Sequence, residues 1–187
     1  MPRVMLTTDR LMLRDFKMPD WQEVHRYASD PEVVKFMEWG PNTADESKSF
    51  VRMAIAFQKD SPRRHFDLAI VTWPEERLIG GCGIYITSPH NHEAFIGYCL
   101  SRDSWAKGYA TEAAKKLLYF GFTHLKLHRI FATCDPRNIA SARVMEKCGM
   151  QFEGLLRENK LISGKWRDSL LYAILEHEWD HRNPTQV

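Results

Sequence analysis

The sequence predicts a mixed α+β domain built around a central mixed, mostly antiparallel sheet of about seven strands flanked by helices. Three observations lead to this fold class. Three β-rich runs, at residues 66–72, 78–87 and 94–100, are separated only by short segments that contain Pro, which is typical of consecutive antiparallel strands. A helical pattern at 110–125 then leads to a short apolar run at 129–134, and such a crossover implies parallel pairing. The length of 187 residues suits one domain with a sizeable core.

The N-terminal part supplies one strand and two helices to this scheme. Apolar and polar residues alternate over 11–15, which predicts the first strand. Residues 19–28 have a helical pattern, and Pro19 is tolerated in the first turn of a helix. Thr43 and Glu46 have the spacing of a capping box, so a second helix is expected to begin there. Its apolar face is expected to be buried and to comprise Phe50, Met53, Ala54 and Phe57.

The C-terminal part predicts a helix and a hairpin. A helical pattern spans residues 139–148, and Gly149 follows at the position where a left-handed glycine often ends a helix. Residues 152–162 and 165–175 are strand-like runs joined by Ser163-Gly164, a turn sequence that favours a hairpin.

Composition indicates an ordinary globular domain. The sequence contains no repeat or linker-like stretch, so a single domain is expected over residues 6–180, with a polar tail at 181–187. No apolar run approaches the roughly 18 residues of a membrane helix, and the first residues lack the apolar core of a signal peptide, so a cytoplasmic location is expected. A net charge of +2 gives no indication of nucleic acid or an anionic membrane as a partner.

The cysteines and histidines do not predict a metal site. Four cysteines lie in apolar segments without paired metal-ligand spacing and are expected to be small buried side chains: Cys82, Cys99, Cys134 and Cys148. The string His177-Glu178-Trp179-Asp180-His181 has the spelling of a zinc-protease helix, but no third ligand follows it. His90 and His92 lie in a turn that contains Pro and Asn, where solvated side chains are common.

The segment from Ser101 to Ala114 predicts an anion site. An apolar strand runs into a turn of small residues that opens a long helix, and the first N–H groups of a helix lack partners within it. Gly108 and Ala110 would let a ligand approach the backbone closely. A tight structural corner is the alternative reading of the same residues.

A second polar pair opens the following helix. Asn138 and Ser141 are three residues apart, so both side chains can face one groove. Plain helix capping explains one of them, because Asn and Ser are both favoured N-cap residues.

Together these segments resemble the GCN5-related N-acetyltransferases (GNAT), in particular the branch of the ribosomal-protein N-acetyltransferases. The turn at 105–110 is similar to the family's pyrophosphate loop, and Asn138, Ser141, Glu146, Lys147 and Gly149 match a helix segment of the branch. The resemblance covers roughly residues 6–180, with Trp105 and Met150 as departures, since many relatives have Gln or Arg at the first position and Phe is common at the second. It implies the GNAT acyl-CoA N-acyltransferase fold and acetyl-CoA as cosubstrate, with no metal.

The resemblance also implies residue roles. Cofactor binding is expected from the loop and helix start, from the backbone of the splayed strand before it, and from the second pair: Trp105, Ala106, Lys107, Gly108, Tyr109, Ala110, Thr111, Cys99, Leu100, Asn138 and Ser141. Ser141 is expected to protonate the leaving thiolate, and Glu93 or Glu158 to act as base, with Glu153, Asp168 or a water chain left open. Trp39 and Gly40 are expected to bind the acceptor.

The implied reaction is direct attack of a primary amine on the thioester through a tetrahedral intermediate. A protein N-terminal α-amine is the expected acceptor, because its pKa near 7.7–8.0 requires less help from a base than a lysine-like amine. A polyamine or an aminoglycoside is the alternative acceptor. A non-catalytic acyl-CoA-binding module is the alternative function. A monomer or a homodimer is expected.

Overall fold

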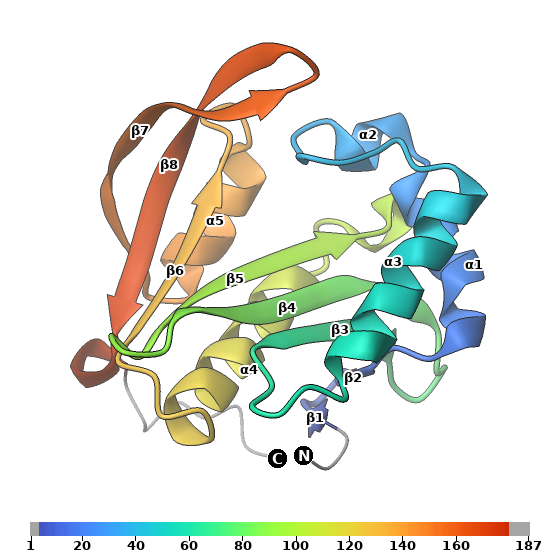
Figure 1. The fold of residues 1–187 in the computed structure, drawn as a ribbon, viewed down its shortest axis with the longest axis horizontal. Coiled ribbons are helices and arrows are strands. Elements are labelled where there is room, and N and C mark those ends of the chain that lie inside the picture. Colours follow the sequence, from blue (N-terminus) through green and yellow to red (C-terminus); the bar gives the residue numbers. More distant parts are fainter. Residues whose placement is uncertain (1–3, 180–187) are drawn as a thin grey trace.

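The computed structural model describes residues 4–179, which form one mixed sheet with helices on both faces (Figure 1). The strands are β1 (Met5–Thr7), β2 (Leu11–Asp15), β3 (His65–Thr72), β4 (Leu78–Ser88), β5 (Glu93–Leu100), β6 (Arg129–Cys134), β7 (Gln151–Ile162) and β8 (Lys165–Leu175). The helices are α1 (Trp21–Ala28), α2 (Pro31–Val34), α3 (Ala44–Phe57), α4 (Tyr109–Thr123) and α5 (Ile139–Lys147). The strand order is β1-β2-β3-β4-β5-β6-β8-β7.

This topology confirms the predicted fold class. β2 to β5 are consecutive antiparallel neighbours, the segment after β5 crosses over through α4, and β6 pairs parallel to β5. β7 and β8 form the predicted hairpin. The sheet has eight strands rather than about seven, because β1 adds three residues to its edge. The expected tail at 181–187 lies outside the described residues, and the domain boundary at 6–180 stays a prediction.

The predicted capping box opens α3. The Thr43 hydroxyl oxygen accepts from the Glu46 N–H at 3.3 Å, and the Glu46 carboxylate accepts from the Thr43 N–H at 2.7 Å. The predicted buried face of α3 is confirmed at Ala54, which is fully buried, and is wrong at Met53, which is 49% exposed. Val51, which the prediction did not include, is also fully buried. Ser47, Val51 and Ala54 form the inward stripe, and Met53 lies toward a cavity described below.

Two apolar clusters cover the two faces of the sheet. Leu117 and Leu118 of α4 are fully buried against Phe66 and Ile96, on the face that also carries α5. The opposite cluster lies under α1 and α3 and includes Val51. Residues on β5 alternate between the faces, as strand geometry requires, so each side of this strand meets a different set of helices.

A buried ion pair ties β2 to the chain that enters β3. The Arg63 guanidinium donates to Asp15 at 2.7 Å, and the two side chains are only 1% and 6% exposed. The Val4 N–H also donates to the Asp15 carboxylate, at 3.0 Å, so the charge is fully engaged.

β5 and β6 pair over only three rungs. Residues Glu93–Phe95 face Arg129–Phe131, and beyond Phe95 the two strands diverge (Figure 1). The last five residues of β5 therefore have no β6 partner. This opening in the middle of the sheet determines where a ligand can reach the backbone.

Candidate active site

The turn between β5 and α4 has the geometry of an anion cradle. Gly108 is the N-cap of α4 with φ +82°, and Ala106 also has a positive φ, of 59°. No side chain caps α4, so the amides of its first turn are not occupied by a cap. The Trp105 indole N–H donates to the Leu100 carbonyl at 2.9 Å, which anchors the turn to the end of β5. Loop amides next to left-handed residues form concave sites for anions.

Arg10 supports this turn from the β1–β2 connection. Its guanidinium donates to the Lys107 carbonyl at 3.1 Å, pairs with Glu112 at 2.5 Å and lies 4.8 Å from the centre of the Tyr109 ring. The Thr8 hydroxyl donates to the same Glu112 carboxylate at 2.6 Å. Sequence reasoning gave Arg10 no role, because its partners lie about a hundred positions along the chain.

Asn138 and Ser141 take different roles at the start of α5. The Asn138 side chain accepts from the Ser141 N–H at 3.1 Å, so Asn138 is a true N-cap. The Ser141 hydroxyl instead shares a hydrogen bond of 3.1 Å with the Tyr98 hydroxyl of β5. Burial raises the pKa of Tyr98, which keeps this phenol protonated. A bond from β5 to α5 thus spans the opening of the sheet.

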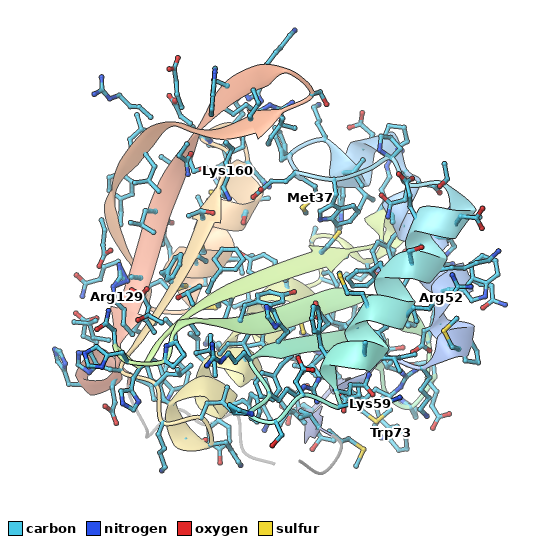
Figure 2. The ribbon with its side chains drawn as sticks, viewed as in Figure 1. Met37, Arg52, Lys59, Trp73, Arg129 and Lys160 are labelled. Atoms are coloured by element: carbon cyan, nitrogen blue, oxygen red, sulfur yellow. The ribbon has the colours of Figure 1, made fainter. Side chains whose placement is uncertain are left out.

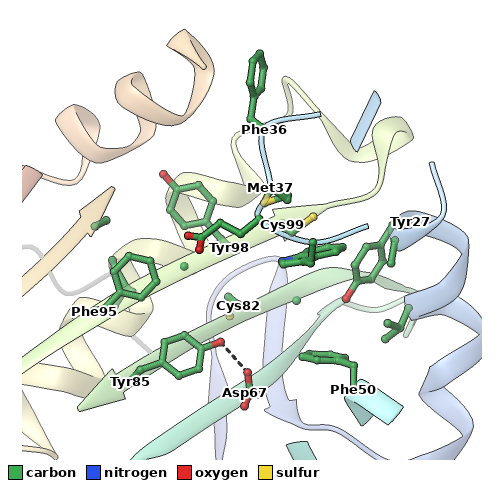
Figure 3. Close-up of a pocket in the computed structure, with 18 of the residues that line it drawn as sticks. Tyr27, Phe36, Met37, Phe50, Asp67, Cys82, Tyr85, Phe95, Tyr98 and Cys99 are labelled. Carbon is green, nitrogen blue, oxygen red and sulfur yellow. Dashed lines mark hydrogen bonds between the residues drawn. The ribbon is translucent and has the colours of Figure 1, made fainter. Parts of the chain in front are cut away.

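A cavity of about 720 Å³ fills this opening and extends over β4 and β3. Its walls come from the unpaired part of β5, from β6, from α1, α3 and the start of α5, and from the loop after α2 (Figure 3). Aromatic side chains dominate the lining: Phe16, Tyr27, Phe36, Trp39, Phe50, Phe57, Tyr85, Phe95 and Tyr98. Asn138 and Ser141 line the same cavity, so the cavity is continuous from the start of α5 to the aromatic side chains.

Two carboxylates reach the cavity, and within residues 4–179 its lining contains no Lys or Arg. Glu38 lies at the mouth and pairs with Lys160 of β7 at 2.9 Å, which brings the hairpin to the loop after α2 (Figure 2). Asp67 lies at the floor, only 5% exposed, and accepts from the Tyr85 hydroxyl at 2.7 Å (Figure 3). Burial raises the pKa of Asp67 and that of Tyr85.

The predicted site residues fall into two groups. The cavity lining contains Trp39, Cys99, Asn138 and Ser141, and the segment Trp105–Thr111 forms the cradle and the first turn of α4. Trp39 is 42% exposed. Leu100 lies at the end of β5 beside this turn.

Three predicted residues lie outside both the cavity lining and the turn at the start of α4. Glu93 is at the paired end of β5, with its carboxylate 3.5 Å from Arg129. Glu158 is exposed on β7, where its N–H donates to Asp168 at 2.8 Å. Gly40 adopts φ +81° in the turn after Trp39, and an added Cβ there would lie 2.9 Å from Val34.

Cys99 faces the cavity as a neutral thiol. Burial raises its pKa to about 12, which removes the thiolate that covalent catalysis needs. Residues 4–179 contain no cluster of three or more side chains able to hold a metal ion, and His181 of the His-Glu-x-x-His string lies outside the described residues. Within the same range, none of the helices combines the length and the apolar character needed to span a bilayer.

Comparison with known proteins identifies the class of protein that carries this site. The family model of the acetyltransferase (GNAT) domain matches residues 10–151. The chain is 39% identical to the uncharacterized N-acetyltransferase YnaD of Bacillus subtilis, over 94% of this chain and 99% of the relative. It is 29% identical to the [ribosomal protein uS5]-alanine N-acetyltransferase of Escherichia coli, over 95% and 94%. A solved GNAT-family acetyltransferase from Bacillus anthracis superposes with a TM-score of 0.82 at 35% identity, over 93% and 99% of the two chains.

The protein is therefore an acyltransferase, and it belongs to the GNAT family of N-acetyltransferases. Acetyl-CoA is its cosubstrate and an amine is its acceptor. The uncapped start of α4 and the open edge of β5 fit this cosubstrate, because its pyrophosphate requires N–H donors and its arm requires a slot.

Proposed function

We propose that this N-acetyltransferase acetylates the α-amine of a protein N-terminus by direct attack on the thioester. The observation that carries the proposal is the single cavity that joins Asn138 and Ser141 on one side to aromatic rings and two carboxylates on the other. A reacting amine can enter from the carboxylate side while the thioester lies in the opening between β5 and β6. The likeness to an alanine N-acetyltransferase supports an α-amine acceptor.

Each part of the site would supply one need of the reaction. The turn at Gly108 would hold the pyrophosphate through backbone N–H groups, and Asn138 would position the amides of the pantetheine arm. Backbone amides of β5 near Cys99 and Leu100 would hydrogen-bond the thioester oxygen as charge develops on it. Ser141, held by Tyr98, would protonate the departing thiolate.

A small cationic amine is the second candidate acceptor. Nine aromatic rings and, among residues 4–179, a carboxylate without an ion-pair partner at Asp67 and a lining without Lys or Arg are suited to a polyamine, because cations bind over aromatic faces and pair with carboxylates. A non-catalytic acyl-CoA-binding module is the remaining alternative. Location in the cytoplasm and a monomeric or homodimeric state stay predictions.

Release of free thiol from acetyl-CoA in the presence of an amine panel tests the proposal. The panel contains an alanyl hexapeptide, the same peptide with a blocked N-terminus, spermidine and an aminoglycoside. Acceleration by the free peptide but not by the blocked one supports the α-amine acceptor, whereas acceleration by spermidine alone assigns the second candidate. Binding of acetyl-CoA with no acceleration by any amine would identify a non-catalytic module.

A further inference from the structure

Two glycines lie side by side on neighbouring strands in the floor of the cavity, next to Asp67. Asp67 of β3 pairs with Gly83 of β4, and Gly83 pairs with Gly97 of β5. Neighbouring strands lie about 4.8 Å apart, so the Asp67 backbone is roughly 10 Å from Gly97. Because the intervening position on β4 and the end position on β5 are both glycine, no side chain built on this row of paired residues separates the carboxylate from the open edge of β5.

The Tyr85 hydroxyl lies in this row. A Cβ added to Gly83 would overlap the hydroxyl oxygen, which places the phenol directly over Gly83. From there the hydroxyl donates to Asp67, and the ring stacks near Phe95 at 6.1 Å between centroids (Figure 3). Tyr85 therefore lies one strand from Gly97, between the carboxylate and the reaction space.

Asp67 has no ion-pair partner among residues 4–179. The titratable and charged groups around it are His65 and Arg63 from the β3 segment, Tyr85 and Cys82 from β4, and Tyr27 from α1. Arg63 is already committed to Asp15. The Nδ1 atom of His65 is buried without a hydrogen-bond partner, so it does not hold the carboxylate either. Such a carboxylate is available to a cationic group that enters the cavity.

We propose that Asp67, acting through Tyr85, is the proton acceptor for the amine nucleophile. This assignment rests on the proposed function and names a proton route for it. Two protons leave the ammonium nitrogen as it becomes an amide. One passes to the Tyr85 oxygen while the Tyr85 proton moves to the Asp67 carboxylate. Asp67 later releases that proton to solvent. The other passes from the nitrogen of the tetrahedral intermediate to the Ser141 oxygen as the C–S bond breaks, while the Ser141 hydroxyl gives its own proton to the thiolate sulfur.

The geometry favours this pair over the carboxylates predicted from the sequence. Gly97 is the β5 residue opposite Gly83. Glu93 lies four residues from Gly97 along β5, at roughly 3.3 Å per residue, on the part of the strand that pairs with β6. Glu158 is exposed on the hairpin. Neither lines the cavity, whereas Asp67 and Tyr85 both do.

The first test replaces the carboxylate. With the panel amine that the wild-type protein acetylates, Asp67→Asn is expected to lower kcat about 10²- to 10⁴-fold while leaving the KM for acetyl-CoA unchanged. Asp67→Glu should recover part of the rate, and Asp60→Asn, an exposed aspartate with no contact to the cavity, serves as the control.

The pH profile separates a proton acceptor from a merely structural residue. Without the acceptor, turnover depends on the neutral amine already present, and below the pKa of the amine this fraction rises about tenfold with each unit of rising pH. The deficit in kcat of Asp67→Asn relative to wild type should therefore shrink about tenfold per unit as the pH is raised toward that pKa. A deficit that stays constant with pH, or a kcat within twofold of wild type, would overturn the assignment.

Gly83→Ala tests the relay without touching either functional group. The three atoms nearest to the new methyl group all belong to the Tyr85 side chain, so we expect the sheet to tolerate it while the hydroxyl is displaced from Asp67. The variant should lose kcat to the same extent as Tyr85→Phe. A Gly83→Ala protein that is folded and fully active, together with a fully active Tyr85→Phe, would exclude the relay.

A titration keeps this assignment separate from the proposed function. If the wild-type protein acetylates no amine of the panel, the proposed function fails. Carboxyl ¹³C NMR with labelled aspartate then tests the role of Asp67 independently of turnover. The resonance that is missing in Asp67→Asn identifies the Asp67 signal. Titration of Asp67 above the ordinary value near 3.9 supports its role as a proton acceptor, and titration at or below that value overturns it.

Discussion

Replacing Gly108 by valine separates the cost of backbone strain from the loss of a phosphate site. Gly108 has φ +82°, and the nearest atom to an added Cβ would be the Arg10 guanidinium at 3.4 Å, so space is adequate and the dihedral angle is the obstacle. A side chain in the left-handed region costs about 1–2 kcal/mol. For a domain of this length that corresponds to a fall in Tm of roughly 2–8 °C.

Binding should suffer for a different reason. A valine that relaxes to negative φ rotates the amides at the start of α4 away from their common centre, and the anion cradle is lost. Acetyl-CoA at 100 times its Kd stabilises the wild-type protein by about 2.7 kcal/mol. This is a rise of roughly 5–11 °C in Tm, which Gly108→Val should abolish.

Gly164→Val is the matched control. Gly164 has φ +73° in the β7–β8 turn with no atom within 4 Å of an added Cβ, so it carries a similar strain far from the cradle. Thermal unfolding with and without acetyl-CoA, together with calorimetric titration, should show equal losses of stability but a loss of affinity only in Gly108→Val. Unchanged affinity in Gly108→Val would refute the assignment of the turn.

Three further outcomes are expected. Ser141→Ala should reduce kcat about 10²-fold or more with little change in acetyl-CoA affinity, measured by thiol release and calorimetry, and a larger effect on affinity would assign Ser141 to binding. Arg63→Ala leaves the Asp15 carboxylate buried and unpaired, which should cost about 3–5 kcal/mol in urea unfolding, and a loss under 1 kcal/mol would contradict that reading. The Arg77 guanidinium lowers the pKa of Asp103 to about 2. The contribution of this pair to the free energy of unfolding is therefore present above the unfolded-state pKa near 3.9 and is lost as the pH falls toward 2. Because both side chains are about half exposed, Asp103→Asn should flatten this acid limb of the stability curve by less than about 1 kcal/mol, and an unaltered limb would exclude the pair as its source.

The sequence predicted most elements because their periodicity is regular. The run at 78–87 corresponds to β4, and the glycine turn at 108 has the left-handed geometry that its motif required. β1 was missed because three residues are too few to reveal a period. The inward face of α3 was partly wrong at Met53, where an open cavity replaces the core that a helical stripe implies.

The floor of the site could not be predicted because it depends on strand register. Asp67 matters only because it lies opposite Gly83, and the two positions are sixteen residues apart in strands whose alignment the pattern leaves open. A glycine two residues before a tyrosine in one strand, with an aspartate in the strand before it, was the available signal. Glu93 was proposed from its place at the head of a strand, where chain order does not reveal the distance along β5 to the opening.

The three rungs between β5 and β6 have a consequence for how a ligand is accommodated. The other neighbouring strands pair over most of their length, but the last five residues of β5 have no pairing with β6. A ligand with amides of its own would complete the backbone pairing there instead of competing with it. Binding should therefore slow hydrogen exchange at these β5 amides most of all, and the protein would reach its full complement of sheet hydrogen bonds only when occupied.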